Sequence, residues 1–260
     1  MGEFIKLEDG RDDGVAVIRL DRPPMNAINR QVTAELGEIV TALAGRDDLG
    51  AVVMWGGPKI FAAGADVKEF ADFGPAEAEK LSHGLNDVLL AFGRLPQVTI
   101  AAINGYALGG GCEVALAADF RVVGDDAVLG QPEILLGVIP GAGGTQRLTR
   151  VVGVTKAKEL VFTGRTVKAD EAVEIGLASA VHPAADLYEA AMALAARYAA
   201  GPAAIAYAKR AIDTGIEQDI ATAVATEARE FGAVFGTEDK ATGIASFLEN
   251  GPGKATFNRR

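Results

Sequence analysis

The sequence predicts an α/β domain that is followed by a region of helices alone. Over the first two thirds of the chain, short apolar runs rich in β-branched residues alternate with longer segments of helical periodicity. The helical segments are long enough to serve as crossover connections, so parallel strands are favoured over tight hairpins. Strand signals nearly vanish from about Thr155 onward. We therefore predict an α/β core over residues 1–195 and a C-terminal helical region over residues 196–260.

The individual elements follow from the same periodicities. Apolar runs predict four strands, GVAVIRL (14–20), GAVVMWG (50–56), VTIAAINGYA (98–107) and DFRVVG (119–124). Helical periodicity predicts helices over residues 30–45, 69–92 and 110–118. In the C-terminal region, residues 217–235 place apolar side chains three and four positions apart, at Ile220, Val224, Ala228, Phe231 and Phe235. Such an apolar stripe is typical of a helix that packs against a partner surface.

Composition and net charge exclude several classes of protein. The 260 residues include 25 Lys and Arg against 35 Asp and Glu, and the net charge of −10 disfavours sequence-independent binding to nucleic acid. No apolar run approaches the roughly 18 residues of a membrane span, and the first residues, MGEFIKLEDG, lack the pattern of a signal peptide. Cys112 is the only cysteine, which excludes an intramolecular disulfide and a cysteine-rich metal site. We expect a cytoplasmic protein that does not bind membranes.

Most familiar catalytic motifs are absent. The stretches GGGCEV and GAGGTQ do not complete the G-x-G-x-x-G nucleotide motif, and neither a P-loop nor a G-x-S-x-G hydrolase motif occurs. His83 and His182 lie in no metal-ligand pattern, so we expect them to be surface or packing residues and expect no metal site. Cys112 has no histidine near it in the sequence and is predicted to be a buried packing residue. The chemistry is therefore left to carboxylates and backbone amides.

The stretch GYALGGGCEVALAAD (105–119) places glycines directly before a carboxylate at a predicted helix start. Backbone N–H groups in the first turn of a helix have no intrahelical acceptor and carry partial positive charge, so one near Gly110 could face a developing negative oxygen. Glycine allows a substrate to approach that backbone closely. Glu113 falls in this first turn, where a carboxylate can also simply complement the helix dipole.

A second candidate carboxylate is Glu133. It follows a proline and precedes three apolar residues that we expect to desolvate it and raise its pKa, Ile134, Leu135 and Leu136. Its separation from Glu113 leaves room for one helix, one strand and a return of the chain, so both carboxylates could reach the same pocket.

A third stretch, IFAAGADVKEF (60–70), also runs through a glycine-containing turn into a helical pattern. Asp66 lies near the predicted helix start, where it would act as an N-cap. The N–H groups of this turn could supply a second donor to the same oxygen.

Three blocks together resemble the crotonase (enoyl-CoA hydratase) superfamily. They are FAAGADVKEF (61–70), NGYALGGGCEVALAADF (104–120) and LGQPEILLGVIPGAGGTQRL (129–148), in the order and at the spacing typical of that family. The resemblance runs from about residue 5 to the C-terminus and is most specific in these blocks. It implies a spiral of ββα units with C-terminal helices that assemble homotrimers, or dimers of trimers.

The resemblance also implies a mechanism. The substrate would be a trans-2-enoyl thioester of coenzyme A, as in fatty acid β-oxidation or related acyl-CoA degradation, and no separate cofactor is expected. The N–H groups of Ala65 and Gly110 would form an oxyanion hole around the thioester oxygen. Glu113 and Glu133 would hold one water between them, with Glu113 favouring attack at the β-carbon and Glu133 delivering a proton to the α-carbon.

By the same resemblance, coenzyme A would lie against two segments and the C-terminal tail. The residues implied by the family pattern are Ala27, Ala63, Gly64, Asp66, Val67, Lys68, Phe247 and Lys254. The tail departs from that pattern because Asn250 stands where similar enzymes often have a lysine. Lys254, Arg259 or Arg260 could take over the phosphate contact.

Two other functions stay open from the sequence. An enoyl-CoA isomerase of the same superfamily would use the same oxyanion hole, but the presence of both glutamates disfavours it. A non-catalytic assembly or RNA-binding protein on the same fold is disfavoured by the net charge of −10 and by the lack of a basic stripe. Acyl chain length, pathway and the choice between trimer and hexamer do not follow from the sequence.

Overall fold

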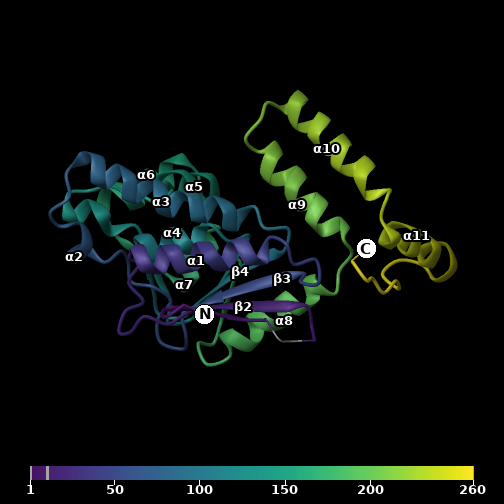
Figure 1. Cartoon of the computed structure of the whole chain (residues 1–260), viewed down its shortest axis with the longest axis horizontal. Coiled ribbons are helices and arrows are strands. Elements are labelled where there is room, and N and C mark those ends of the chain that lie inside the picture. Colours follow the sequence, from purple (N-terminus) through teal and green to yellow (C-terminus); the bar gives the residue numbers. More distant parts are fainter. Residues whose placement is uncertain (1, 10–11, 260) are drawn as a thin grey trace.

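The computed structural model describes residues 2–9 and 12–259, and its centre is a six-stranded sheet (Figure 1). The strand order is β1-β2-β3-β4-β6-β9, and every neighbouring pair is parallel except β1 and β2. The strands are β1 Ile5–Glu8, β2 Val15–Leu20, β3 Ala51–Trp55, β4 Val98–Ile103, β6 Phe120–Gly124 and β9 Ala180–His182. The predicted α/β class with parallel strands is therefore confirmed.

A smaller three-stranded sheet, β5-β7-β8, lies beside the first, with β5 Tyr106–Leu108, β7 Val128–Gly130 and β8 Thr166–Lys168. Our single predicted strand over residues 98–107 is wrong, because the chain turns at Gly105 and continues as β5 in the second sheet. Gly105 has φ +55°, and a Cβ there would lie 2.2 Å from the carbonyl oxygen of Lys59. The corner therefore requires glycine.

The path of the chain gives the ββα spiral that the resemblance implies. One unit runs from β4 through β5 into α4 (Gly110–Leu116), and the next runs from β6 through β7 into the 3₁₀ helix η1 (Pro132–Leu136). α5 (Gly144–Val152), α6 (Val154–Thr163) and α7 (Ala169–Glu174) follow. The near absence of strands predicted after Thr155 is corrected by β8 and β9, which have three residues each and are too short to show a periodicity.

Helices cover both faces of the larger sheet. α1 (Arg30–Leu43) and α3 (Pro75–Gly93) pack on one face in a core cluster that includes Ile18, Met54 and Ala101. α8 (Leu187–Ala199) packs on the other face, against a second cluster that includes Val17 and Val53. Because successive residues of a strand point to opposite faces, strands buried on both sides read as the continuous apolar runs seen in the sequence.

The predicted helix over residues 69–92 is wrong in its extent, because it is two helices. α2 covers only Val67–Phe70, and α3 begins at Pro75 after an N-cap at Gly74. The Glu77 carboxylate accepts a hydrogen bond from the Gly74 N–H at 2.8 Å. Proline at the first helical position and glutamate two residues later are typical of a helix start. A new helix therefore begins inside the segment that we predicted as one helix.

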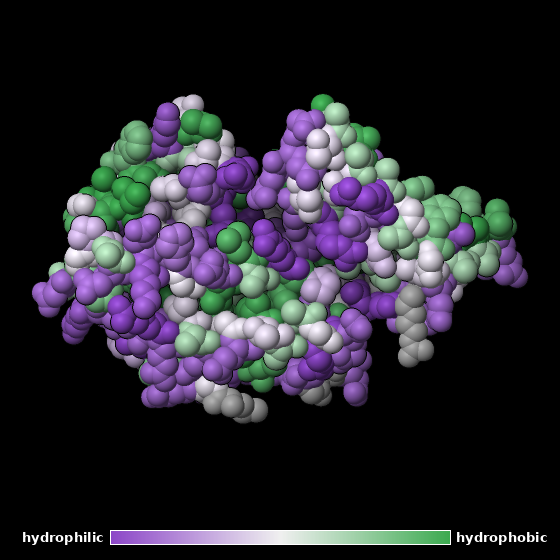
Figure 2. All heavy atoms as spheres, turned by 45° about the horizontal axis from the view of Figure 1, so that its top comes forward, coloured by the Kyte–Doolittle hydropathy of each residue, from purple (hydrophilic) through white to green (hydrophobic). Residues whose placement is uncertain are grey.

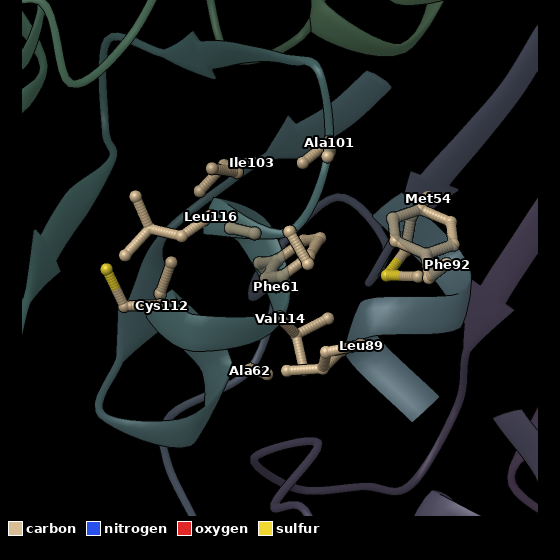
Figure 3. Close-up of a cluster of buried hydrophobic side chains, with 14 of the residues drawn as sticks. Met54, Phe61, Ala62, Leu89, Phe92, Ala101, Ile103, Cys112, Val114 and Leu116 are labelled. Carbon is tan, nitrogen blue, oxygen red and sulfur yellow. The ribbon is translucent and has the colours of Figure 1, made fainter. Parts of the chain in front are cut away.

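α4 contributes apolar side chains to the core next to the site. Its apolar side chains belong to the same core cluster as Phe61 and Ile103, and Figure 3 shows Cys112, Val114 and Leu116 in this cluster. Cys112 is 1% exposed, and burial raises its pKa to about 12. The predicted packing role of this cysteine is confirmed, since its thiol stays protonated at neutral pH.

The C-terminal helices α9 (Ala204–Gly215), α10 (Ile220–Val234) and α11 (Glu238–Asn250) form an arm beside the body (Figure 1). Lys209 is the buried residue of α9, and its Nζ donates to Asp119 Oδ2 at 2.7 Å and to the Gln97 carbonyl at 3.0 Å. This ion pair joins the arm to the edge of β4 and β6. The predicted boundary after residue 195 falls within α8, which packs on the sheet.

The arm leaves its apolar stripe uncovered. Ile220, Val224, Phe231 and Phe235 are between 52% and 80% exposed. Figure 2 shows apolar surface on the arm and a hollow between the arm and the body. Within residues 2–9 and 12–259, no helix combines the length and apolar character needed to cross a membrane.

Candidate active site

Glu113 lies at the point where the second sheet meets α4. The chain leaves β5, turns at Gly109 with φ +49°, and begins α4 at Gly110, so Glu113 falls in the first helical turn. Its side chain bonds to a loop distant in the sequence: Oε1 accepts hydrogen bonds from the N–H groups of Ala142 and Gly144, both at 2.7 Å. The dipole-complementing role alone therefore does not account for this carboxylate.

The surroundings of Glu113 shift its pKa in opposite directions. The residue is 3% exposed, and burial raises its pKa. The two N–H donors and the nearby guanidinium of Arg147 lower that pKa, because they stabilise the ionised carboxylate. Burial is the largest of these effects, so the pKa of Glu113 lies above its ordinary value.

Glu133 lies in η1 directly after Pro132, and burial raises its pKa to about 7. The charge of Glu113 contributes to this shift, which places the two carboxylates within electrostatic range of each other. The structure thus brings together the two glutamates that the sequence singled out. Because the groups interact, the pair rather than either residue has the observable pKa values.

The predicted cause of the burial of Glu133 is wrong. The three apolar neighbours in the sequence point outward, with exposures of 38%, 71% and 61% for Ile134, Leu135 and Leu136. The Glu133 carboxylate instead faces the turn at Gly109, where a Cβ would lie 3.1 Å from Oε1. A short helix presents consecutive side chains in different directions, so neighbours in sequence need not cover one another.

Gln131 is a site residue that our sequence analysis missed. It is fully buried, and its amide, oriented so that the NH₂ group faces Glu133, donates to Oε1 at 2.8 Å and to Oε2 at 3.2 Å. Gln131 stands two residues before Glu133, so its buried amide can donate to the carboxyl group. The signal was present in the sequence QPE but was indistinguishable from an ordinary polar residue.

The backbone N–H groups of Ala65 and Gly110 lie next to each other, as the resemblance implies for an oxyanion hole. A Cβ on Gly110 would lie 3.4 Å from the Ala65 nitrogen. Ala65 is exposed, and among the described residues no hydrogen bond uses either N–H group as a donor. Two neighbouring free donors can bind an oxygen that becomes negative.

The two segments assigned to coenzyme A lie side by side near these donors. Ala63 donates its N–H to the Met25 carbonyl at 3.0 Å, and Ile28 donates to the Gly64 carbonyl at 2.8 Å. Arg22 ties the segments together, since it donates to the Ala27 carbonyl at 2.9 Å and to Asp66 Oδ2 at 2.7 Å.

Asp66 occupies the N-cap position of α2, but its carboxylate pairs with Arg22 and makes no side-chain capping bond. The predicted position of Asp66 at the helix start is confirmed, while its carboxylate bonds to the charged guanidinium, a stronger donor than a neutral N–H. Val67 and Lys68 follow on the exposed side of α2.

The structure does not bring the tail residues to this site within one chain. Phe247 is 58% exposed in α11, and Lys254 follows it on the exposed tail. α11 lies at the opposite end of the molecule from α2 (Figure 1). Arg259 packs near Gly50 and Ala199, away from α2 and α4, and Arg260 lies outside the described residues.

The histidines contribute nothing to the site. His83 is exposed on α3 beside Glu79, at 3.7 Å between Nε2 and Oε1, and His182 ends β9. The expected surface and packing roles fit these positions. Within the described ranges, no group of three or more His, Cys, Asp or Glu residues is arranged to hold a metal ion.

Comparisons with known proteins agree on one family. A family model described as enoyl-CoA hydratase/isomerase matches residues 10–259. The chain is 45% identical over 244 residues to a probable enoyl-CoA hydratase, echA8, of Mycobacterium bovis, with 92% of this chain and 93% of that protein covered. It is 39% identical over 242 residues to the short-chain-enoyl-CoA hydratase of Clostridium acetobutylicum, with coverage of 92% and 93%. Among solved structures, an enoyl-CoA hydratase from Bacillus anthracis superposes with a TM-score of 0.90 at 38% identity, covering 95% of this chain and 96% of that chain.

Replacing Gly109 with alanine tests the space in front of Glu133. A Cβ would lie 3.1 Å from Glu133 Oε1, so we expect the carboxylate to move and turnover to fall by about 10²-fold, as small misplacements of catalytic groups can cost. Gly153→Ala is the matched control, because Gly153 also has a positive φ, +80°, but no atom within 4 Å of the new Cβ. Both variants should lose stability in urea unfolding, and only Gly109→Ala should lose turnover. Equal losses of activity would contradict the steric role of Gly109.

The raised pKa of Glu133 predicts a stability gain for Glu133→Gln. Between pH 4.5 and 7 the folded protein binds more protons than the unfolded chain, so its free energy of unfolding falls as pH rises. Above pH 7 the variant has no buried charge to carry and should be more stable than the parent, by up to about 3 kcal/mol, with little difference below pH 4.5.

Urea unfolding at pH 4.5 and pH 8 measures this difference. Glu159→Gln is the control of opposite sign, since Arg165 lowers the pKa of Glu159 to about 2 and the ionised form is the favoured one. Its stabilising effect is present above the unfolded pKa and lost as pH falls toward 2, so this variant should be less stable than the parent at pH 8. A pH-independent effect of Glu133→Gln would show that its carboxyl group is not desolvated.

Proposed function

Because the chain belongs to the enoyl-CoA hydratase/isomerase family, we propose that it adds water across the 2,3 double bond of a trans-2-enoyl-CoA thioester to give a 3-hydroxyacyl-CoA. The observation that carries this function is the pairing of a buried carboxylate, Glu113, with a half-buried one, Glu133, beside the free backbone donors of Ala65 and Gly110. Relatives named as enoyl-CoA hydratases, one of them for short chains, support it.

The oxyanion hole stabilises the charge that hydration creates. The thioester oxygen would accept hydrogen bonds from the N–H groups of Ala65 and Gly110, which lie together and have no other acceptor among the described residues. Attack at the β-carbon moves an electron pair through the conjugated system onto that oxygen. Each donor aimed there stabilises the enolate by about 2.7–4 kcal/mol relative to the ground state.

The two glutamates divide the proton transfers. Glu113 takes a proton from the attacking water, because its Oε1 is held by two N–H groups and those donors favour the ionised form. Glu133 gives a proton to the α-carbon, because its pKa of about 7 keeps it partly protonated at neutral pH. One O–H bond of water, the O–H bond of Glu133 and the C=C π bond of the substrate break. The C–O and C–H bonds of the product and an O–H bond on Glu113 form.

The coenzyme A moiety would lie along the segments that Arg22 joins. Ala27, Ala63 and Gly64 offer backbone groups beside the oxyanion hole, and the first turn of α2 adds Asp66, Val67 and Lys68. Lys68 is exposed and free to meet a phosphate. Phe247 and Lys254 would serve this role only from a neighbouring subunit, because α11 lies far from α2 in the same chain.

We further propose that the chain forms a homotrimer or a dimer of trimers. Neighbouring subunits would cover the stripe on α10. They would also cover other exposed apolar residues of the arm, namely Ile212 in α9, Ile216 directly after α9, and Ile244 and Leu248 in α11. A single buried cysteine with a protonated thiol suits a reducing compartment, so we propose a cytoplasmic location.

Removing either carboxylate should abolish most of the hydration. Glu113→Gln and Glu133→Gln should each lower turnover by about 10² to 10⁴, the range for general acid–base groups, with Michaelis constants little changed because the amide keeps the shape. The double variant should lose less than the product of the single effects, since both groups act on one water. The assay follows loss of the conjugated thioester absorbance over a ladder of enoyl-CoA lengths.

An isomerase would respond differently. It shuttles one proton between two carbons with one carboxylate, so one of the two variants would stay nearly as active as the parent. That one-sided result, together with no hydration of a short trans-2-enoyl-CoA by the parent, would contradict the hydratase function and support the isomerase function.

Assembly is tested by size measurement in solution. We expect a particle of three or six chains, since three exposed helices with apolar faces need cover. Ile220→Asp with Phe231→Asp should shift the particle toward monomers and lower stability. A fully active monomer at low concentration would contradict the interface.

A further inference from the structure

The loop from Pro140 to Gly144 binds partners on two sides. On one side its N–H groups at Ala142 and Gly144 hold Glu113 Oε1. On the other side its carbonyl groups at Gly141 and Ala142 accept hydrogen bonds from side chains of neighbouring helices. The position of Glu113 therefore depends on groups that hold this loop from behind.

Arg147 is the charged group among them. Its Nη1 donates to the Ala142 carbonyl at 2.9 Å, from the first turns of α5. The guanidinium lies against the bare backbone of Gly143, where a Cβ would come within 2.1 Å of Nη1. Gly143 has φ +93°, so the loop both adopts a glycine conformation and leaves room for the guanidinium.

We propose that Arg147 is a positioning residue of the reaction: its guanidinium holds the loop so that two N–H groups fix Glu113 beside a positive charge. Both N–H groups bind the same oxygen, Oε1, which leaves Oε2 for the water. A loop that loses its anchor at Ala142 would loosen both bonds at once. The kinetic part of this inference rests on the proposed function, whereas the electrostatic part does not.

Among the described residues, three titratable groups lie around Glu113. Arg147 faces it from α5, Glu133 faces it from η1, and the neutral thiol of Cys112 precedes it on α4. From α3, the uncharged Ser82 and Asn86 reach the loop at the Gly141 carbonyl. Arg147 is thus the cation whose charge lowers the pKa of Glu113.

The test compares Arg147→Gln with Arg147→Lys and with a control on the same helix. Arg150→Gln is that control, because Arg150 is exposed and, among the described residues, bonds only to Gln146 of its own helix. Arg147→Met, which keeps the apolar stem, is a second neutral variant should the glutamine variant fail to fold. Circular dichroism and urea unfolding establish that each variant is folded.

We expect Arg147→Gln to lower turnover about 10- to 100-fold with an unchanged Michaelis constant, as misplacement of a catalytic group does. Loss of the positive charge raises the pKa of Glu113, so the acid limb of kcat/KM should move to higher pH, by about 1 unit. Arg147→Lys keeps the charge and should keep the acid limb of the parent. Arg150→Gln should match the parent in both respects.

An infrared titration separates this inference from the proposed function. The protonated carboxyl band of Glu113, identified by its loss in Glu113→Gln, should titrate at higher pH in Arg147→Gln than in the parent, whether or not the protein hydrates an enoyl thioester. An unshifted band would overturn the inference, as would equal kinetic effects of Arg147→Gln and Arg150→Gln. An inactive parent with a shifted band would overturn the function alone.

Discussion

The first turn of α4 approaches the backbone of residues 62–65 so closely that no side chain fits between them, and the site depends on this contact. A Cβ on Gly111 would lie 2.0 Å from the Ala62 carbonyl oxygen, and one on Gly110 would lie 3.4 Å from the Ala65 nitrogen. A Cβ on Gly109 would meet Glu133. Gly111 thus makes room for the packed backbone and Gly109 for the second carboxylate, while Gly110 lies in contact with the second oxyanion donor. Only backbones this close can aim two N–H groups at one oxygen.

Two carboxyl groups at that helix start would repel each other if both were ionised, and their surroundings decide which one keeps a proton. Glu113 accepts hydrogen bonds from two backbone N–H groups and lies near a guanidinium, and these groups offset part of the burial that raises its pKa. Glu133 faces a buried amide and no cation, so burial dominates and its pKa rises to about 7. The arrangement destabilises the folded protein at neutral pH and supplies an acid and a base within one pocket.

The larger elements of the fold could be predicted from local patterns, because the order of apolar and polar residues along the sequence indicates which of their faces are buried. β2, β3 and β4 are apolar on both faces and read as continuous runs, and the α10 stripe reads as a helix with one uncovered side. The three-residue strands β7, β8 and β9 escaped prediction, since pairing with distant strands rather than periodicity defines them. Gly74 and Pro75 mark the break between α2 and α3 in the sequence. The helical periodicity on either side led us to predict one continuous helix.

By itself the sequence determined which groups the site contains: two glutamates in recognisable blocks and glycines before a helix start. The tertiary structure decided what surrounds them. The N–H groups that hold Glu113 come from residues about thirty positions along the chain, and the half-buried Glu133 lies against Gly109 and Gln131 rather than against its own apolar neighbours. The physical reason is that a carboxyl group's charge state depends on solvent exclusion and on the donors within hydrogen-bond reach. Both are set by segments that meet only after the chain has folded.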